Sequence, residues 1–410
     1  MNDNNPAVLT RLRVRLLHIG YFFAFGFFLP YLTLYFSRIL LTAGGPGAEG
    51  LVGILVFLHA GAGVLALPAA GYLADRFRIE SRLIAICATS VAVGALVLAV
   101  PAFVPGLGLS MVLVFLLPGA VVCGFFTKPM IPLIDTVTLK HLRSSGRSPS
   151  EYGSFRMGGS FGFVLSAVTA GVVLSLTGII GMTVVLHAGG YLILAWIARK
   201  RMPAHLERVQ IPWHHLRRDR VFQRFVVFAF FASMGVNSAF LFTGLFLDQI
   251  EAGFMVMGLV FAASAGPEIP VMRLAGRFIR RFGARRVIAF GLMSQILKLL
   301  LFTAFADSPS TWIFVLVSVL HGIGFALLLT GSVEFVDRQA HPDMRATYQN
   351  LFQLLWGSAI AIGGPVSGFI VSYWSATVLM AACAVLLILT LIYLGLMVRG
   401  KAGYAAVESA

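Results

Sequence analysis

The sequence predicts an all-α membrane protein of about twelve transmembrane helices in two six-helix bundles. Hydrophobic residues make up 59% of the 410-residue chain and charged residues only 11%, which leaves too little polar surface for a soluble protein of this length. Apolar stretches of the roughly 20 residues needed to cross a bilayer follow one another along the chain. A single long polar stretch divides them into two halves.

The apolar stretches give the expected helices in order. We expect spans at approximately 14–37, 51–74, 82–104, 107–139, 152–176, 179–198, 221–247, 252–272, 286–306, 310–333, 347–372 and 375–398. Each is long enough to cross the hydrocarbon core as a helix, because a helix rises about 1.5 Å per residue.

Positive charge collects in every second gap between these stretches, starting with the N-terminal tail. Of the 31 lysines and arginines, only Arg38 lies in the opposite set of gaps, and three lie inside apolar stretches: Lys128, Arg156 and Lys298. Cytoplasmic loops carry such an excess, so we expect a multi-pass plasma (inner) membrane protein with both termini in the cytoplasm. The same interleaving excludes nucleic acid as a partner, because the net charge of +15 has no basic domain of its own.

The polar stretch 199–220 separates the halves. We expect an N-terminal bundle at 1–198, a cytoplasmic linker at 199–220 and a C-terminal bundle at 221–410. His214 and His215 lie in the linker beside arginines, where a solvated interfacial loop explains them better than a metal site.

No cofactor or metal is expected. The three cysteines each lie within an expected span, so no disulfide framework or thiol metal site follows; they are Cys87, Cys123 and Cys383. The first span lacks a small-residue cleavage site and is followed by a second span, so we expect it to be retained.

A weak internal repeat supports the two halves. GYLADR at 71–76 follows the second span, and GRFIRRFG at 276–283 follows the eighth. Both resemble the G-x-L-a-D-r-x-G-r-r loop of the major facilitator superfamily. The resemblance implies two pseudo-symmetric bundles, a substrate site between them and alternating access by rocking. In that family the acid helps to latch the halves, a gating role that would fall on Asp75 with Arg76, whereas Arg280 stands at the acidic position of the second copy. The alternative is a generic positive cytoplasmic turn.

The fifth span shows how such helices pack. Small residues recur at every fourth position, which lets two helices approach closely in lipid; they are Ser154, Gly158, Gly162, Ser166 and Ala170. Arg156 and Phe163 are two turns apart and share another face. We therefore expect one face to pack while the other carries a cation and a ring.

Charged residues inside the spans mark a candidate site, because a charge near the bilayer centre costs at least about 2.5–3.5 kcal/mol and usually faces a partner or a cavity. Asp135 and Arg156 lie at the same depth, roughly 7 Å from the cytoplasmic end at about 1.5 Å per residue, so we expect an ion pair. Lys128 lies two turns deeper than Asp135 on the same face, and Phe163 lies at that depth on the next helix. These four residues line one cleft, unless they form only a structural ion pair and a lysine satisfied by carbonyls.

The C-terminal half has its own set. Lys298 and His321 both fall near the midplane, and Glu268 is the deepest acid of this half. Pro267 and Pro270 flank Glu268, and helix-breaking prolines free backbone carbonyls near cavities. The alternative for His321 is a hydrogen-bonded core histidine.

Other polar residues have simpler explanations. His18 and His59 have no comparable partner and are expected to be core histidines. Glu334 lies at a span end, where we expect it to meet cytoplasmic arginines.

The motifs around these charges resemble one branch of the superfamily. KPMIPLID at 128–135 and YGSFRMGGSFGF at 152–163 resemble the lactose-permease-like branch, closest to the phenylpropionate permeases and nucleoside:proton symporters. There a helix 4 carboxylate and a helix 5 arginine bind substrate, and a ring two turns along stacks on it. The resemblance implies these roles for Asp135, Arg156 and Phe163.

Two further regions carry the same likeness. GYFFAFGFFLP at 20–30 is most similar to the phenylpropionate group, and the segments around Lys298 and His321 also resemble this branch, which usually has Arg where Lys298 stands. In lactose permease the proton-carrying acid lies one turn after the helix 10 histidine, where this chain has Gly324. If the protein couples to protons, another group must titrate: Glu268 is our first choice and Asp135 our second, with His321 as a relay, because a buried carboxylate can take up a proton near neutral pH.

The charge count favours an anionic substrate. Three cations face two acids in the expected cavity, and aromatic residues are plentiful, so an aromatic or other small carboxylate fits better than a neutral sugar.

The sequence therefore predicts a secondary active transporter, a proton-coupled symporter of a small organic solute, present as a monomer in lipid. The nearest alternative is a proton-coupled sugar or nucleoside symporter, followed by an uncoupled facilitator or exporter of the same fold. A non-transporting receptor would bind ligand without flux. We do not expect an enzyme, because the chain has no H-E-x-x-H, no G-x-S-x-G on a strand-to-helix turn and no G-x-x-x-x-G-K.

Overall fold

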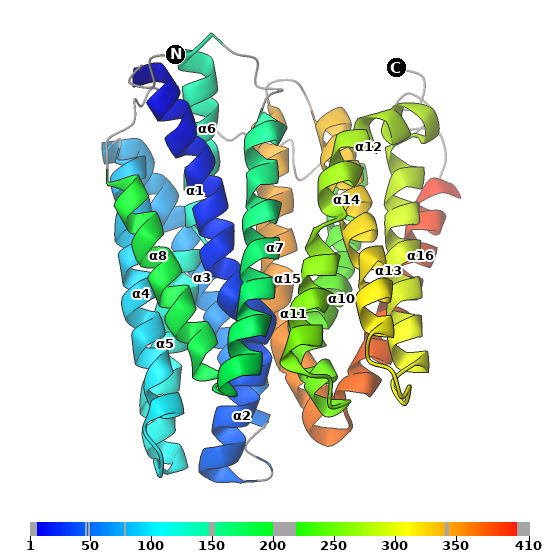
Figure 1. Ribbon diagram of the computed structural model, residues 1–410. Helices are drawn as coiled ribbons and strands as arrows, with labels where there is room; N and C mark the ends of the chain where they lie inside the picture. Colours follow the sequence, from blue (N-terminus) through cyan, green and yellow to red (C-terminus); the bar gives the residue numbers. More distant parts are fainter. Residues whose placement is uncertain are drawn as a thin grey trace. The chain divides into compact units, whose positions relative to one another are not determined.

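The computed structural model describes residues 6–45, 47, 50–77, 79–146, 152–199, 219–340 and 344–399 (Figure 1). Over these ranges the regular elements are all helices and no strand occurs. The predicted all-α class is confirmed.

Within the described residues, twelve segments are long and apolar enough to cross a membrane. The helices are α1 (Pro6–Phe28), the 3-10 turn η1 (Leu29–Tyr31), α2 (Leu32–Gly44), α3 (Leu51–Phe77), α4 (Glu80–Phe103), α5 (Leu109–Thr127), α6 (Met130–Ser144), α7 (Tyr152–Thr177), α8 (Gly181–Ala198), α10 (Arg220–Gln249), α11 (Phe254–Ala265), α12 (Glu268–Phe282), α13 (Ala284–Ala304), α14 (Ile313–Gln339), α15 (Arg345–Tyr373) and α16 (Ala376–Arg399).

Proline interrupts three of the twelve spans. The span Arg11–Gly44 breaks at Pro30 between α1 and α2, the span Leu109–Ser144 breaks at Pro129 between α5 and α6, and the span Phe254–Phe282 breaks at Pro267 between α11 and α12. Proline lacks a backbone N–H and clashes with the preceding turn, so it ends or kinks a helix. The second and third breaks fall beside Lys128 and Glu268.

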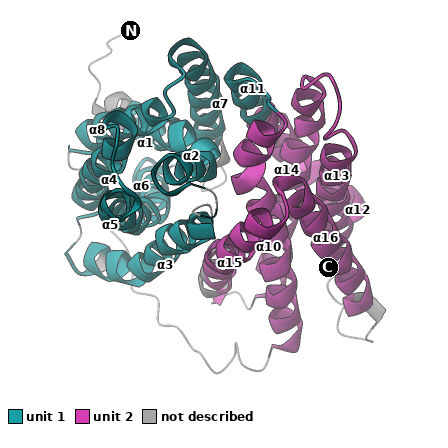
Figure 2. Ribbon diagram, turned by 90° about the horizontal axis from the view of Figure 1, so that it is seen from below, with its two compact units in different colours: residues 1–208, 251–262 teal, residues 209–250, 263–410 magenta. Residues whose placement is uncertain are grey.

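The chain folds into two compact units, shown in separate colours in Figure 2. The first comprises residues 1–208 and 251–262, and the second comprises residues 209–250 and 263–410. The sequence placed 251–262 in the C-terminal bundle at 221–410, whereas the structure gives them to the first unit. The reason is a close helix contact, because a Cβ on Gly258 of α11 would lie 2.7 Å from the Ala167 carbonyl oxygen of α7.

The predicted division at 199–220 stays a prediction. Residues 200–218 of that linker, including His214 and His215, lie outside the described residues.

In the first unit, α1 packs along α7 more extensively than any other pair of helices. Gly158 and Gly162 of α7 face Ile19 of α1, and a Cβ on Gly162 would collide with the Ile19 carbonyl oxygen. The expected close approach at the small residues is confirmed for these glycines. The face of α7 that carries Arg156 also contacts α1, however, because the Arg156 guanidinium lies over the ring of Phe22 on that helix.

In the second unit, the corresponding contact joins α13 and α14. A Cβ on Gly291 would lie 2.6 Å from the Leu328 backbone nitrogen, and a Cβ on Gly331 would lie 2.8 Å from Ile288. Glycine lets these two helices touch through their backbones, which brings Lys298 of α13 and His321 of α14 into one neighbourhood.

Candidate functional site

A chain of polar contacts joins α6 to α7 in the first unit. The Tyr152 hydroxyl, at the first residue of α7, hydrogen-bonds to the Asp135 carboxylate and also to Arg156 one turn further on. Arg156 has no acceptor, so it donates to the hydroxyl, and the hydroxyl donates to the carboxylate. The structure thus brings Asp135 and Arg156 together, with Tyr152 between them.

One oxygen of the Asp135 carboxylate has no hydrogen-bond donor in the described residues. Oδ1 of Asp135 is buried and accepts no hydrogen bond from any part of the chain that the structure describes. An unsatisfied buried polar atom costs about 1–3 kcal/mol. A proton on the carboxyl or a donor on a ligand would satisfy it.

Aromatic rings on α1 surround the Arg156 guanidinium. Its Cζ lies 4.2 Å from the centroid of the Phe22 ring, within the range of a cation–π contact. Tyr21 of the same helix interacts electrostatically with both Arg156 and Asp135. The cation therefore has one face on a ring while its edge donates to Tyr152.

His18 belongs to the same neighbourhood. Its Nε2 lies 2.9 Å from Oγ1 of Thr138 on α6, and that hydroxyl already donates to the Ile134 carbonyl, so Nε2 carries the hydrogen and donates. The His18 ring meets the Tyr152 ring edge-on at 6.2 Å. The buried Nδ1 has no partner in the described ranges.

Sequence reasoning gave no role to Tyr152 and treated His18 as core. The signal was present as spacing: Tyr152 precedes Arg156 by four residues, and His18 precedes Phe22 by four, the interval at which helical side chains meet.

Lys128 faces another helix. It lies in the break between α5 and α6, its stem packs against Gly63 of α3, and its ammonium interacts electrostatically with His59. The backbone at Lys128 and Pro129 keeps right-handed helical angles through the break, and the expected common face with Asp135 stays a prediction.

Phe163 packs toward α1. It is 7% exposed, and a Cβ on Gly26 would lie 3.0 Å from its ring. Its expected role as a stacking platform for substrate stays a prediction.

In the second unit, Lys298 is 1% exposed. Its ammonium lies 4.5 Å from the centroid of the Phe302 ring and interacts electrostatically with His321 and Cys383. The apolar contacts hold a strongly hydrated cation away from water, an arrangement that favours an anionic ligand.

Gln295 fixes the orientation of His321. The amide nitrogen Nε2 donates to the His321 carbonyl at 2.9 Å, so the amide oxygen faces Nδ1 of the imidazole at 3.1 Å and accepts from it. Phe240 stacks on the imidazole at 4.8 Å. Because Nδ1 carries the hydrogen, Nε2 of the neutral ring is the acceptor, which suits a proton relay.

Glu268 is half-buried at the first position of α12, directly after the break at Pro267. Pro267 interrupts the helix, whereas Pro270 lies within the first turn of α12; the expected cavity beside Glu268 stays a prediction. Gly322 of α14 crosses at this break, where its Cβ would lie 2.5 Å from the Ser264 carbonyl oxygen and 3.1 Å from Pro267. The break thus lies against the residue that follows His321.

Gly324, which stands where lactose permease has its proton-carrying acid, is closely surrounded by other atoms. A Cβ on Gly324 would lie 2.8 Å from the Gly291 carbonyl oxygen and 3.0 Å from Nε2 of Gln295. A carboxylate side chain does not fit there without moving α13.

The expected gating residues are only partly described. The Asp75 side chain lies outside the described residues. Arg76 is exposed and donates to the hydroxyl of Tyr72, 2.7 Å away on the same helix. A gating role stays a prediction for both.

Two ion pairs lie near the ends of helices. Glu334 accepts from Nε of Arg338 at 2.7 Å, so it meets an arginine as expected. Glu80 and Lys140, which the sequence did not single out, form a buried ion pair between α4 and α6.

The comparison with known proteins decides the family. The MFS_1 like family matches residues 12–394, almost the whole chain. The chain belongs to this family of major facilitator transporters. It is an integral membrane transporter and not an enzyme, and the predicted superfamily and fold are confirmed.

Two relatives of this transporter are named for a substrate. It is similar to the maltose permease of Geobacillus stearothermophilus, with 24% identity over 86% of each chain. It is similar also to the nucleoside permease NupG of Escherichia coli, with 24% identity over 78% of this chain and 79% of NupG. The crystal structure of the nucleoside transporter NupG has the same fold, with a TM-score of 0.78 at 20% identity over 96% of this chain and 100% of that one.

Proposed function

We propose that this transporter is a proton-coupled symporter of a small organic carboxylate. The observation that carries the proposal is the buried chain Asp135–Tyr152–Arg156, in which Oδ1 of Asp135 has no partner in the described ranges. A buried carboxylate must be compensated by a neighbouring cation or take up a proton.

The hydrogen-bonded side chains of Asp135, Tyr152 and Arg156 suggest how a proton and an anion bind together. While Asp135 is ionised, its charge compensates Arg156 through Tyr152. A proton on Oδ1 cancels the carboxylate charge and leaves Arg156 to bind the carboxylate of the substrate. Each ligand then strengthens the binding of the other, which is the requirement for coupling.

Lys298 supplies a second anion-binding group, in the other unit. Its ammonium is buried against Phe302, and the neighbouring His321 is stacked on Phe240. These phenylalanine rings beside a buried cation suit an aromatic carboxylate. The ring of the substrate would pack against them while its carboxylate pairs with the Lys298 ammonium.

A sugar or nucleoside is the second candidate substrate. The relatives named above are a maltose permease and a nucleoside permease. An ionised Asp135 accepts and Arg156 donates, a combination that also binds the hydroxyl groups of a neutral solute.

Transport into proteoliposomes with an imposed pH gradient tests the proposal. The substrates compared are benzoate and phenylpropionate, maltose, and uridine. We expect accumulation of an aromatic carboxylate that collapses with the gradient. Accumulation of maltose or uridine alone would favour the second candidate, and transport that survives collapse of the gradient would indicate an uncoupled facilitator.

Two variants separate the candidate proton carriers. The variants are Asp135→Asn and Glu268→Gln. Whichever of them replaces the residue that carries the proton should retain substrate exchange but lose accumulation driven by the pH gradient. The matched control is Arg338→Gln, which removes an exposed partner of Glu334 and should accumulate substrate as the wild type does. Accumulation by both acid variants would contradict proton transfer at either carboxylate.

We also propose that the protein is a monomer of the inner membrane with both termini in the cytoplasm. The charge distribution supports this orientation. An impermeant maleimide should label Ser310→Cys in intact cells and Ser145→Cys only after permeabilisation; the reverse result would contradict it. Both positions are exposed, and the three native cysteines are buried.

A further inference from the structure

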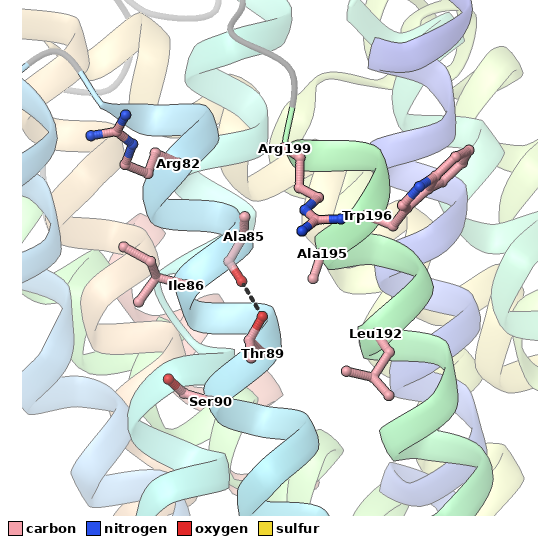
Figure 3. Close-up of a pocket in the computed structure, with 9 residues that line it drawn as sticks. All are labelled: Arg82, Ala85, Ile86, Thr89, Ser90, Leu192, Ala195, Trp196 and Arg199. Atoms are coloured by element: carbon pink, nitrogen blue, oxygen red, sulfur yellow. Dashed lines mark hydrogen bonds between the residues drawn. The ribbon is translucent and has the colours of Figure 1, made fainter.

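A groove opens between α4 and α8 on the first unit (Figure 3). Its volume is about 660 Å³, within the range of pockets that hold a small-molecule ligand. Two alanines, Ala85 and Ala195, face the gap from opposite helices, and their small side chains leave it open. The remaining lining residues are Arg82, Ile86, Thr89, Ser90, Leu192, Trp196 and Arg199.

Two arginines flank the mouth of the groove. Arg82 is the third residue of α4 and Arg199 directly follows α8, so both lie where an apolar span ends. Figure 3 shows the Arg199 guanidinium at the α8 side of the groove, above Ala195, and Arg82 at the end of α4 with its guanidinium turned away from the groove. Arginines at the end of a span lie at the level of lipid headgroups.

Neither arginine is neutralised by a carboxylate within the described ranges. The acid nearest in sequence, Glu80, is buried and pairs with Lys140 on α6. Both arginines are exposed, so their charge is available to a ligand.

Below the arginines the groove becomes polar and then apolar. The Thr89 hydroxyl donates to the Ala85 carbonyl at 2.9 Å, which leaves its oxygen able to accept, and Ser90 lies beside it (Figure 3). Ile86, which lines the groove between Arg82 and Thr89, is 47% exposed. Beyond Ser90 the same helix continues with Val93 and Leu96, which are 57% and 50% exposed. From the span end inward, α4 thus presents a cation, then two hydroxyls beyond Ile86, and then exposed hydrocarbon.

We infer that this groove binds an anionic phospholipid. Its phosphodiester binds the Arg199 guanidinium at the mouth, with the Arg82 side chain turning in from the rim of α4. Its glycerol backbone lies at Thr89 and Ser90, and an acyl chain lies along Val93 and Leu96. Guanidinium groups bind phosphate oxygens through charge-assisted hydrogen bonds, and basic pockets between membrane helices bind anionic headgroups. The inference rests on the membrane-spanning fold and not on the proposed substrate.

Native mass spectrometry of the full-length protein tests the inference. The detergent-solubilised protein is titrated with dioleoyl phosphatidylglycerol and, in parallel, with dioleoyl phosphatidylethanolamine. We expect phosphatidylglycerol to bind more tightly than phosphatidylethanolamine. In Arg82→Gln/Arg199→Gln its affinity should fall about 30-fold, since each cation near the surface contributes about fivefold.

The control variant is Arg277→Gln/Arg280→Gln. It removes the same charge from exposed positions of α12 outside the groove. It should leave the affinity for phosphatidylglycerol within about twofold of the wild type, since none of the groove's lining residues changes. Arg82→Lys/Arg199→Lys should retain most of the affinity, and Ala85→Leu, which fills the groove without changing charge, should lower it. Arg199→Gln alone, with an expected loss of about fivefold, serves if the double variant does not fold.

Three outcomes would overturn the inference. They are equal affinity for the two lipids, equal losses in the groove and control variants, and displacement of phosphatidylglycerol by glycerol 3-phosphate. The last result would mean that a soluble phosphate, not a lipid, occupies the site.

Discussion

Gly324 offers a sharp test of how the fold limits the choice of proton carrier. The resemblance to lactose permease implies a titrating acid at this place. Here a Cβ would lie 2.8 Å from the Gly291 carbonyl oxygen and 3.0 Å from Nε2 of Gln295. Gln295 in turn orients His321 through two hydrogen bonds. A side chain at position 324 must therefore move backbone or disturb the histidine.

The expected cost follows from these contacts. Overpacking a tight interface costs about 1–3 kcal/mol, and replacing a helical glycine by alanine gains about 1 kcal/mol. Gly324→Ala should thus change the free energy of unfolding by about 0–2 kcal/mol in the destabilising direction. Gly324→Glu adds the cost of a buried acid, at least about 2.5–3.5 kcal/mol.

Gly189→Ala is the matched control, because no atom lies within 4 Å of a Cβ at that helical glycine. It should be about 1 kcal/mol more stable than the wild type, so the two alanine variants should differ by about 1–3 kcal/mol. Equilibrium unfolding in mixed micelles, followed by circular dichroism, measures this difference. Equal stability of the alanine variants, or a Gly324→Glu protein as stable as the wild type, would refute the steric argument.

Three further predictions concern other sites. Lys140→Met should lower the free energy of unfolding by about 3–5 kcal/mol, because it leaves Glu80 buried and unpaired, whereas Glu80→Leu/Lys140→Leu should be near neutral; equal losses in both would contradict this. Asp219→Ala should cost about 0.5–2 kcal/mol through the cap it gives Phe222 at 2.9 Å, measured in the same unfolding assay. Arg156→Ala should abolish substrate binding in calorimetric titration and Arg156→Lys should weaken it at least about tenfold; wild-type affinity in Arg156→Lys would show that the planar guanidinium is not required.

The sequence by itself determined the class of this protein and the number of its spans. Runs of apolar residues specify membrane helices because the bilayer thickness sets their length, and each run can be recognised without its neighbours. The isolated charges inside the runs, such as Asp135, Arg156 and Lys298, were visible for the same reason. The twelve predicted spans accordingly agree with the twelve membrane-capable segments.

Only the tertiary structure decided how those charges are connected. Hydropathy does not show that Tyr152 bridges Asp135 and Arg156, because that contact depends on how α6 meets α7. Nor does it show that the Lys128 stem packs against Gly63, because that contact depends on how α3 meets the end of α5. Which residues lie in a span is fixed by transfer from water into lipid, whereas which of them meet is fixed by steric packing between helices, as at Gly162 and Gly324, where neighbouring backbones leave no room for a side chain.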